Sequence, residues 1–101
     1  MAEFVRVAAV SDIPEGSGRT VEARGRKIAI FNAGGAFYAI DNACQHHGGP
    51  LGEGDVYGTR VVCPWHGWEY DFASGCNTDD PSMKLVCYAV EVRGNDLLVE
   101  V

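Results

Sequence analysis

Hydrophobic residues in this chain occur in runs of five to nine residues that alternate in part with polar residues. Runs of this kind, rich in Val, Ile, Tyr and Phe, are typical of β-strands. Turns separate them: 32–35 and 93–96 predict hairpins, and the Pro, Gly and Ser of 11–18 predict a loop. No stretch of ten residues free of Gly and Pro carries a helical stripe, so any helix is expected to be a single turn. The predicted strands are EFVRVAAV (3–10), TVEAR (20–24), KIAIFNA (27–33), AFYAID (36–41), TRVVC (59–63), WEYDF (68–72), KLVCYAVEV (84–92) and DLLVEV (96–101).

This succession of strands predicts an all-β fold, an antiparallel β-sandwich or small barrel. At 101 residues the chain is expected to form one domain, 1–101, because the sequence has no repeat and no linker. No apolar run approaches the roughly 18 residues of a membrane span, and the acidic Glu3 makes the N-terminus unlike a signal peptide. We therefore expect a soluble, cytoplasmic and monomeric protein that does not bind membranes.

The net charge of −6 is concentrated in one segment. Residues 41–80 hold seven acids and one base, whereas the remainder holds seven of each. A field of this sign repels phosphates, so nucleic acid is excluded as a partner. Two interpretations stay open: the acids steer a basic protein partner, or they form a solvated face.

Two mixed pairs of metal-ligating residues lie in that acidic segment. Cys44 and His46 are followed, after sixteen residues, by Cys63 and His66. Each pair stands where a predicted strand runs into a loop with Gly and Pro, so two hairpin tips can face each other. If the two Cys were ordinary buried thiols and the two His ordinary surface residues, the presence of two closely spaced Cys/His pairs would be a coincidence. The pattern instead indicates a metal site.

The ligand types suit either zinc or an iron–sulfur cluster. Zinc accepts two thiolates and two imidazoles, but zinc fingers usually place two Cys on one knuckle and two His on a helix. A [2Fe–2S] cluster in which two His replace two Cys on one iron explains why each loop is mixed. In that arrangement Cys44 and Cys63 bind one iron, and His46 and His66 bind the other.

At these residues the chain resembles the Rieske iron–sulfur proteins, whose loops read Cys-x-His and Cys-x-x-His. The glycines and proline of 48–51 and the stretch HGWEYDFASG (66–75) also match. The resemblance implies a Rieske-like fold with one [2Fe–2S] cluster, held by approximately residues 41–82 at the tips of two hairpins. It also implies that Pro81, in the stretch 79–83, belongs to a loop that covers the cluster.

The absence of certain residues argues against two of the kinds of protein in which Rieske clusters occur. Rieske subunits of the bc type carry an extra Cys in each loop, and Gly49 and Trp65 occupy those positions here. Ring-hydroxylating oxygenases need a second iron site with two His, but only His47 remains, which we interpret as a loop residue beside the cluster without a catalytic role. No G-x-G-x-x-G motif for a flavin or nicotinamide nucleotide is present.

The resemblance therefore implies an electron carrier and not an enzyme: a Rieske-type ferredoxin of a bacterial ring-hydroxylating dioxygenase system. Its partners would be a flavin-dependent ferredoxin reductase and a terminal oxygenase. Two alternatives stay open. One is an accessory subunit of a larger reductase, of the nitrite reductase small-subunit type, and the other is a zinc-stabilised interaction module.

Four more side chains bear on this hypothesis. In high-potential Rieske proteins a Ser and a Tyr after the second His donate hydrogen bonds to the sulfurs, and these positions hold Trp68 and Tyr70 here. With one donor lost, the reduction potential should lie in the lower half of about −150 to +300 mV. Tyr70 is equally well interpreted as a core aromatic residue. Cys76 and Cys87 are expected to be free thiols, with a bridge between them as the less favoured alternative.

Overall fold

The computed structural model describes residues 3–42, 50–64, 67–80 and 82–101. Its strands form three antiparallel sheets with the orders β1-β10-β9, β2-β3-β4-β8 and β5-β6-β7. We call the first two sheets the two-sheet body and the third the small sheet. The strands are β1 Phe4–Ala9, β2 Ser17–Ala23, β3 Arg26–Ala33, β4 Ala36–Asp41, β5 Asp55–Tyr57, β6 Arg60–Val62, β7 Glu69–Asp71, β8 Cys87–Tyr88, β9 Val90–Arg93 and β10 Asp96–Glu100.

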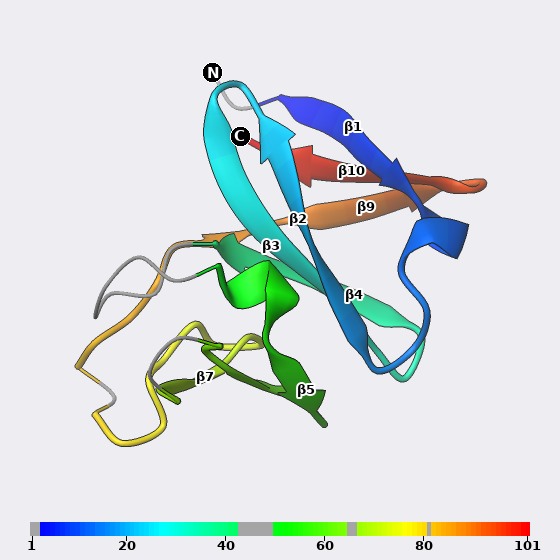
Figure 1. The fold of residues 1–101 in the computed structure, drawn as a ribbon. Helices are drawn as coiled ribbons and strands as arrows, with labels where there is room; N and C mark the ends of the chain where they lie inside the picture. Colours follow the sequence, from blue (N-terminus) through cyan, green and yellow to red (C-terminus); the bar gives the residue numbers. More distant parts are fainter. Residues whose placement is uncertain (1–2, 43–49, 65–66, 81) are drawn as a thin grey trace.

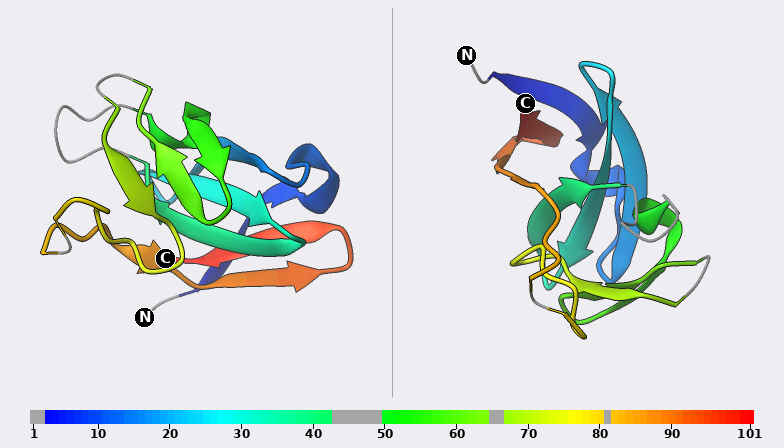
Figure 2. Two further views of the ribbon diagram at one scale, coloured as in Figure 1. Left: turned by 90° about the horizontal axis from the view of Figure 1, so that it is seen from below. Right: turned by 90° about the vertical axis from the view of Figure 1, so that its left-hand side faces the viewer.

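The sheet β2-β3-β4-β8 is the middle layer of the molecule (Figure 1). The left panel of Figure 2 shows the small sheet on one side of it and β9 and β10 on the other. The antiparallel β-sandwich that the sequence predicts is thus present, with an added third layer.

The central strand β3 shows why this arrangement is stable. Its residues Ile28 to Phe31 form a continuous apolar run, and all are buried because both faces of their sheet are covered. Ile28 and Ile30 point into the core shared with the sheet of β1, β9 and β10. Ala29 and Phe31 point the other way, into the core shared with the small sheet.

Aromatic rings fasten the small sheet to the middle layer. Phe72, which follows β7, stacks on Phe31 of β3 with ring centroids 4.4 Å apart. It also contacts Tyr38 of β4 at 5.5 Å. Both contacts bury aromatic surface between layers, so the position of the small sheet depends on the middle sheet.

The predicted hairpins at 32–35 and 93–96 are confirmed, since Ala33 pairs with Ala36 and Arg93 with Asp96. In the first of them Gly34 and Gly35 both have positive φ, of 62° and 89°, which is the conformation that a two-residue hairpin turn requires. Helical structure in the described residues consists of two 3₁₀ turns, η1 (Val10–Asp12) and η2 (Leu51–Glu53). None of these described helices is long and apolar enough to cross a membrane.

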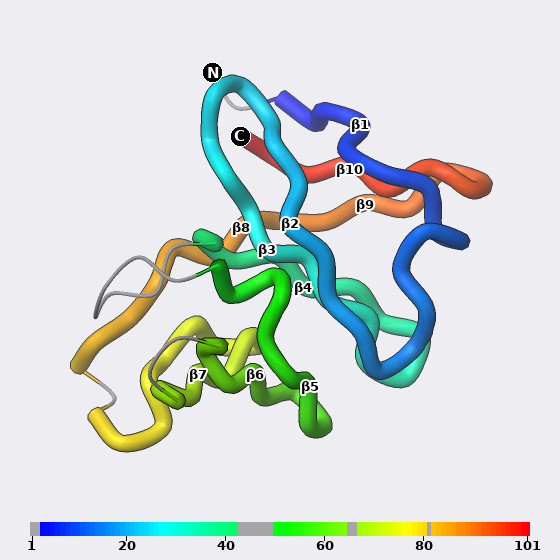
Figure 3. Tube along the Cα trace, in the orientation of Figure 1, coloured from blue at the N-terminus to red at the C-terminus, as the bar shows by residue number. Residues whose placement is uncertain are grey.

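Three details of the predicted pattern are wrong. The run 84–92 is not one strand: β8 pairs with β4 and β9 with β10, so the chain changes sheets at Ala89 (Figure 3). The short strand β5 was not predicted, because the glycines at 52, 54 and 58 on either side of it are typical of a loop. The strand β2 begins at Ser17, inside the predicted loop 11–18, because pairing with β3 extends it.

Candidate functional site

The second Cys/His pair begins where β6 ends. Cys63 follows this strand directly and is 2% exposed, within the apolar cluster that also holds Leu51, Val61 and Tyr70. Its backbone N–H donates to the Trp68 carbonyl at 2.7 Å, and its own carbonyl accepts from Gly67 N–H at 3.1 Å. These two hydrogen bonds join the described ends of the β6–β7 connection and hold the backbone of Cys63 in place.

The described segments that flank the two loops of predicted ligands lie close together. The chain that leaves the first loop forms η2 and then β5, which pairs with β6, the strand that leads to Cys63. At Gly54 a Cβ would collide with the carbonyl oxygen of Val62. The backbones on either side thus approach as closely as glycine permits, so the segment that follows the first predicted Cys/His pair lies against the strand that leads to Cys63.

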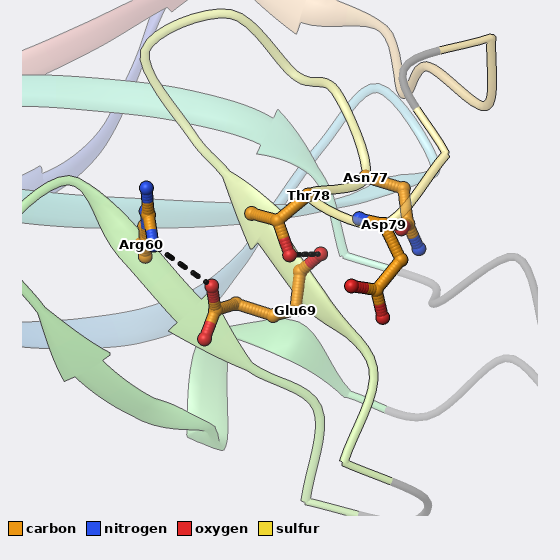
Figure 4. A network of polar contacts seen from close by, with 5 residues as sticks. All are labelled: Arg60, Glu69, Asn77, Thr78 and Asp79. Carbon is orange, nitrogen blue, oxygen red and sulfur yellow. Dashed lines mark hydrogen bonds and ion pairs between the residues drawn. The ribbon is translucent and has the colours of Figure 1, made fainter.

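A third segment, 77–83, lies beside β7; residue 81 is outside the described residues. The side-chain oxygen of Asn77 accepts hydrogen bonds from the backbone N–H groups of Asp79 and Asp80 at 2.8 and 3.0 Å. The backbone N–H of Asn77 donates to the Met83 carbonyl at 2.8 Å. Figure 4 shows Asn77 and Asp79 beside Glu69 of β7. A cavity of about 290 Å³ separates this segment from Trp68. The segment and Trp68 thus face each other across this cavity.

Six of the predicted site residues lie outside the described residues: Cys44, His46, His47, Trp65, His66 and Pro81. Among the described residues, no three His, Cys, Asp or Glu side chains converge as a metal site. Of the four predicted ligands, Cys63 alone lies within the described residues, so the complete ligand set stays a prediction.

Trp68 and Tyr70 occupy different environments. Trp68 is half-buried and packs on the apolar cluster around Cys63, whereas Tyr70 lies inside that cluster and is fully buried. The location of Tyr70 agrees with its interpretation as a core aromatic residue. Donation from its hydroxyl to a cysteine sulfur stays a prediction.

Several acidic side chains lie on η2, β5 and β7 and in the third segment. An ion pair of 3.4 Å joins Arg60 to Glu69, and Thr78 donates to the Glu69 carbonyl from the other side (Figure 4). Four further acids lie in η2, in β5 and in the third segment, and we call them the acidic rim. The rim residues are Glu53, Asp55, Asp79 and Asp80, all exposed.

Cys76 and Cys87 are free thiols. The favoured interpretation of this pair is thus confirmed, and the bridge between Cys76 and Cys87 is not formed. The Sγ of Cys87 lies against Gly75, and partial removal from water raises the pKa of this thiol. A raised pKa leaves less thiolate at neutral pH, so Cys87 is a poor nucleophile.

Sequence reasoning missed the buried asparagines of the site. Asn77 had a recognisable signal, because Asn followed by Thr, Asp and Asp is typical of a turn closed by the Asn side chain. Asn42 has no local signal: its side-chain oxygen accepts from Thr20 and from Gly52, which are distant in sequence. Only the folded chain brings these groups together.

Comparison with known proteins agrees with this geometry. The model of the Rieske [2Fe-2S] domain matches residues 3–91. Ferredoxin CarAc of Metapseudomonas resinovorans is 31% identical over 98 residues, covering 95% of this chain and 92% of that protein. The ferredoxin component of the naphthalene 1,2-dioxygenase/salicylate 5-hydroxylase systems of Ralstonia sp. is 29% identical, covering 96% and 94%.

Solved structures show the same similarity. A chain from the complex of reduced oxygenase and oxidized ferredoxin in carbazole 1,9a-dioxygenase is 30% identical, with a TM-score of 0.86 over 95% of this chain and 91% of that chain. The ferredoxin of carbazole 1,9a-dioxygenase from Nocardioides aromaticivorans IC177 is 27% identical, with a TM-score of 0.87 over 95% of both chains. A nitrite reductase small subunit from Mycobacterium tuberculosis has a TM-score of 0.90 over 100% and 96% at 21% identity, which shows a shared fold.

Proposed function

This chain belongs to the Rieske [2Fe–2S] domain family, and on that premise we propose that it is a one-electron carrier between a flavin-dependent ferredoxin reductase and a terminal oxygenase. The observation that carries the proposal is the similarity to ferredoxin components of dioxygenase systems over more than nine-tenths of both chains. We assign it no substrate chemistry of its own. We expect it to act as a monomer in the cytoplasm.

The cofactor of this family is one [2Fe–2S] cluster, which supplies a single one-electron redox couple when bound. We propose Cys44 and Cys63 as ligands of one iron, with His46 and His66 on the other. The donor set fits such a cluster, because it offers two thiolates and two imidazoles. The surroundings of Cys63 fit as well: its side chain is buried at the end of β6, where apolar neighbours exclude water.

The terminal oxygenase is the better supported partner. A structural relative at 30% identity comes from a complex of oxygenase and ferredoxin in carbazole 1,9a-dioxygenase. The reductase follows from the need for an electron donor in the dioxygenase systems to which the relatives belong. We propose that the acidic rim steers this chain toward basic surfaces of both partners, because opposite charges raise the rate of encounter.

Reconstitution tests this function directly. The purified protein should be coloured, bleach on reduction by dithionite, and contain about two irons and two acid-labile sulfides per chain. With the reductase and oxygenase of a ring-hydroxylating system and NADH, it should support product formation that ceases when it is omitted. A colourless protein that contains zinc after anaerobic purification would contradict the proposal.

The alternatives are less well supported. The likeness to nitrite reductase small subunits is a likeness of fold, at 21% identity. A zinc module does not account for the match to the [2Fe-2S] domain family.

A further inference from the structure

One buried asparagine joins the two ends of the first ligand-bearing loop. Asn42 is the last described residue before the span 43–49, and Leu51 and Gly52 follow shortly after it. The carbonyl oxygen of Asn42 accepts from Leu51 N–H at 2.8 Å, and its side-chain oxygen accepts from Gly52 N–H at 2.8 Å. Two hydrogen bonds from one residue thus close the base of the loop.

Asn42 is itself held by the middle sheet. Its N–H donates to the Lys27 carbonyl of β3 at 3.2 Å, and its side-chain oxygen accepts from the Thr20 hydroxyl of β2 at 2.9 Å. The residue is only 6% exposed. The base of the loop is therefore fastened to the two longest strands of the molecule.

The other end of the loop lies as close to β2 as the backbone allows. A Cβ at Gly52 would stand 2.5 Å from the Thr20 hydroxyl oxygen and 2.6 Å from the Thr20 nitrogen. This glycine is needed for close approach, and the approach puts its N–H within reach of Asn42. A single amide oxygen with two lone pairs then accepts both donors without placing a charge in the core.

We propose that Asn42 is a positioning residue for the iron ligands Cys44 and His46, which it serves by fixing both ends of their loop. The inference rests on the proposed function, because it takes these two residues as cluster ligands. The physical reason is that a loop whose ends are held has fewer conformations, so its ligands stay in the geometry that the cluster needs. Groups that orient metal ligands in this way commonly change metal affinity by about 10- to 100-fold when they are removed.

Asn32 provides a matched control. Like Asn42 it is buried, at 8% exposure, and its side chain makes two hydrogen bonds, donating to the Ile13 carbonyl at 2.8 Å and accepting from Gly35 N–H at 3.1 Å. It lies beside the β3–β4 turn, at the opposite end of β3 from the contact between Lys27 and Asn42. Replacing it removes comparable interactions from the fold without touching the loop.

The experiment follows cluster release from the loaded protein. Visible absorbance is recorded at fixed temperature with an iron chelator in excess, for the wild type and for Asn42→Ala, Asn42→Asp and Asn32→Ala. We expect release about tenfold faster in Asn42→Ala and less than about twofold faster in Asn32→Ala, although both variants should melt at lower temperature. Asn42→Asp keeps the side-chain acceptor but buries a charge, so its release should be slower than that of Asn42→Ala and faster than that of the wild type.

A spectroscopic readout separates positioning from stability. The electron paramagnetic resonance signal of reduced Asn42→Ala should broaden or shift, because the ligands of its loop no longer hold one geometry, while Asn32→Ala keeps the signal of the wild type. Equal release rates and unchanged signals in the two alanine variants would overturn the inference. If Asn42→Ala does not accumulate, Thr20→Val and Thr20→Ser replace it, and equal release from these two would overturn the inference as well.

Iron and sulfide analysis of the wild type keeps the two hypotheses apart. A wild-type protein without the cluster contradicts the proposed function. A wild-type protein with the cluster, and with no difference between Asn42→Ala and Asn32→Ala, contradicts only the role of Asn42.

Discussion

In the two-sheet body, β1 to β4 are six to eight residues long and pair with their neighbours, apart from one irregularity between Arg6 and Ala8. In the small sheet, three strands of three residues each pair over the same short length. The body is held by many equivalent ladder bonds and a continuous core. The small sheet depends on single contacts: a glycine against a carbonyl, a stacked ring, and asparagines that close its loops.

This difference has a functional meaning. A ladder of equivalent bonds tolerates the loss of one member, whereas a single contact that places a loop has no substitute. The body thus tolerates single changes, whereas single contacts of the small sheet hold the described residues that flank the two loops. Changes of similar chemical size should therefore have unequal effects in the two regions.

The largest difference is expected for cysteines. Cys63→Ser should abolish cluster assembly, because a hydroxyl is a harder and much less acidic ligand than a thiolate. Cys44→Ser should behave in the same way. Cys87→Ser in β8 and Cys76→Ser should leave iron and sulfide content unchanged. Normal iron and sulfide in Cys63→Ser would remove Cys63 from the ligand set.

Glycine substitutions should show the next largest difference between the two regions. Gly54→Ala places a methyl group against the Val62 carbonyl, a backbone atom that moves only with its strand. We expect a cost of about 3 kcal/mol together with accelerated cluster loss. Gly94→Ala in the body meets open space and carries only the strain of its φ of 62°, about 1–2 kcal/mol. Thermal melting and cluster content measure both, and equal melting temperatures would show that the small sheet adapts.

Acids of the two regions should differ in docking. Asp79→Asn removes a charge from the acidic rim and should slow association with the oxygenase about two- to threefold at low salt. Glu22→Gln, on an exposed position of β2, removes the same charge and should have a smaller effect. Stopped-flow electron transfer at several salt concentrations measures this, since screening acts beyond about 10 Å at 0.1 M. A rate that ignores salt would mean that the rim is only a solvated face.

The reduction potential should respond to aromatic residues of the small sheet alone. We expect the wild type in the lower half of about −150 to +300 mV, with Trp68→Ser raising the value and Tyr70→Phe lowering it by a few tens of mV, because hydrogen bonds to sulfur stabilise the reduced state. Tyr38→Phe in the body should not change it. Voltammetry decides, and a wild-type value near +300 mV would refute the low-potential carrier.

The smallest effect concerns pH. Removal from water, followed by its hydrogen bond to Asp41, raises the pKa of Tyr88 above its ordinary value of 10.0, while Arg26 opposes the shift. Since the folded state holds this proton more tightly, its contribution to stability is complete below pH 10 and is lost as the pH rises through the folded pKa. Tyr88→Phe should therefore flatten the decline of melting temperature above about pH 10. An identical decline in both proteins would show that other groups cause it.

The sequence by itself determined features that depend on neighbouring residues. Alternation and turn chemistry placed most strands and both predicted hairpins, because side-chain direction and turn geometry are local properties. The spacing of Cys44, His46, Cys63 and His66 identified the family, since mixed pairs of ligands in two loops suit few cofactors.

Only the tertiary structure decided the features that join distant residues. Nothing near Asn42 in the sequence indicates that Thr20 and Gly52 will share its side-chain oxygen, and nothing near Gly54 indicates that Val62 will lie against it. The run 84–92 looks like one strand because its residues suit a strand, but it divides between two sheets because separate partners, β4 and β10, are available to its two halves. Such contacts depend on which surfaces the packed layers bring together, and that depends on the whole chain.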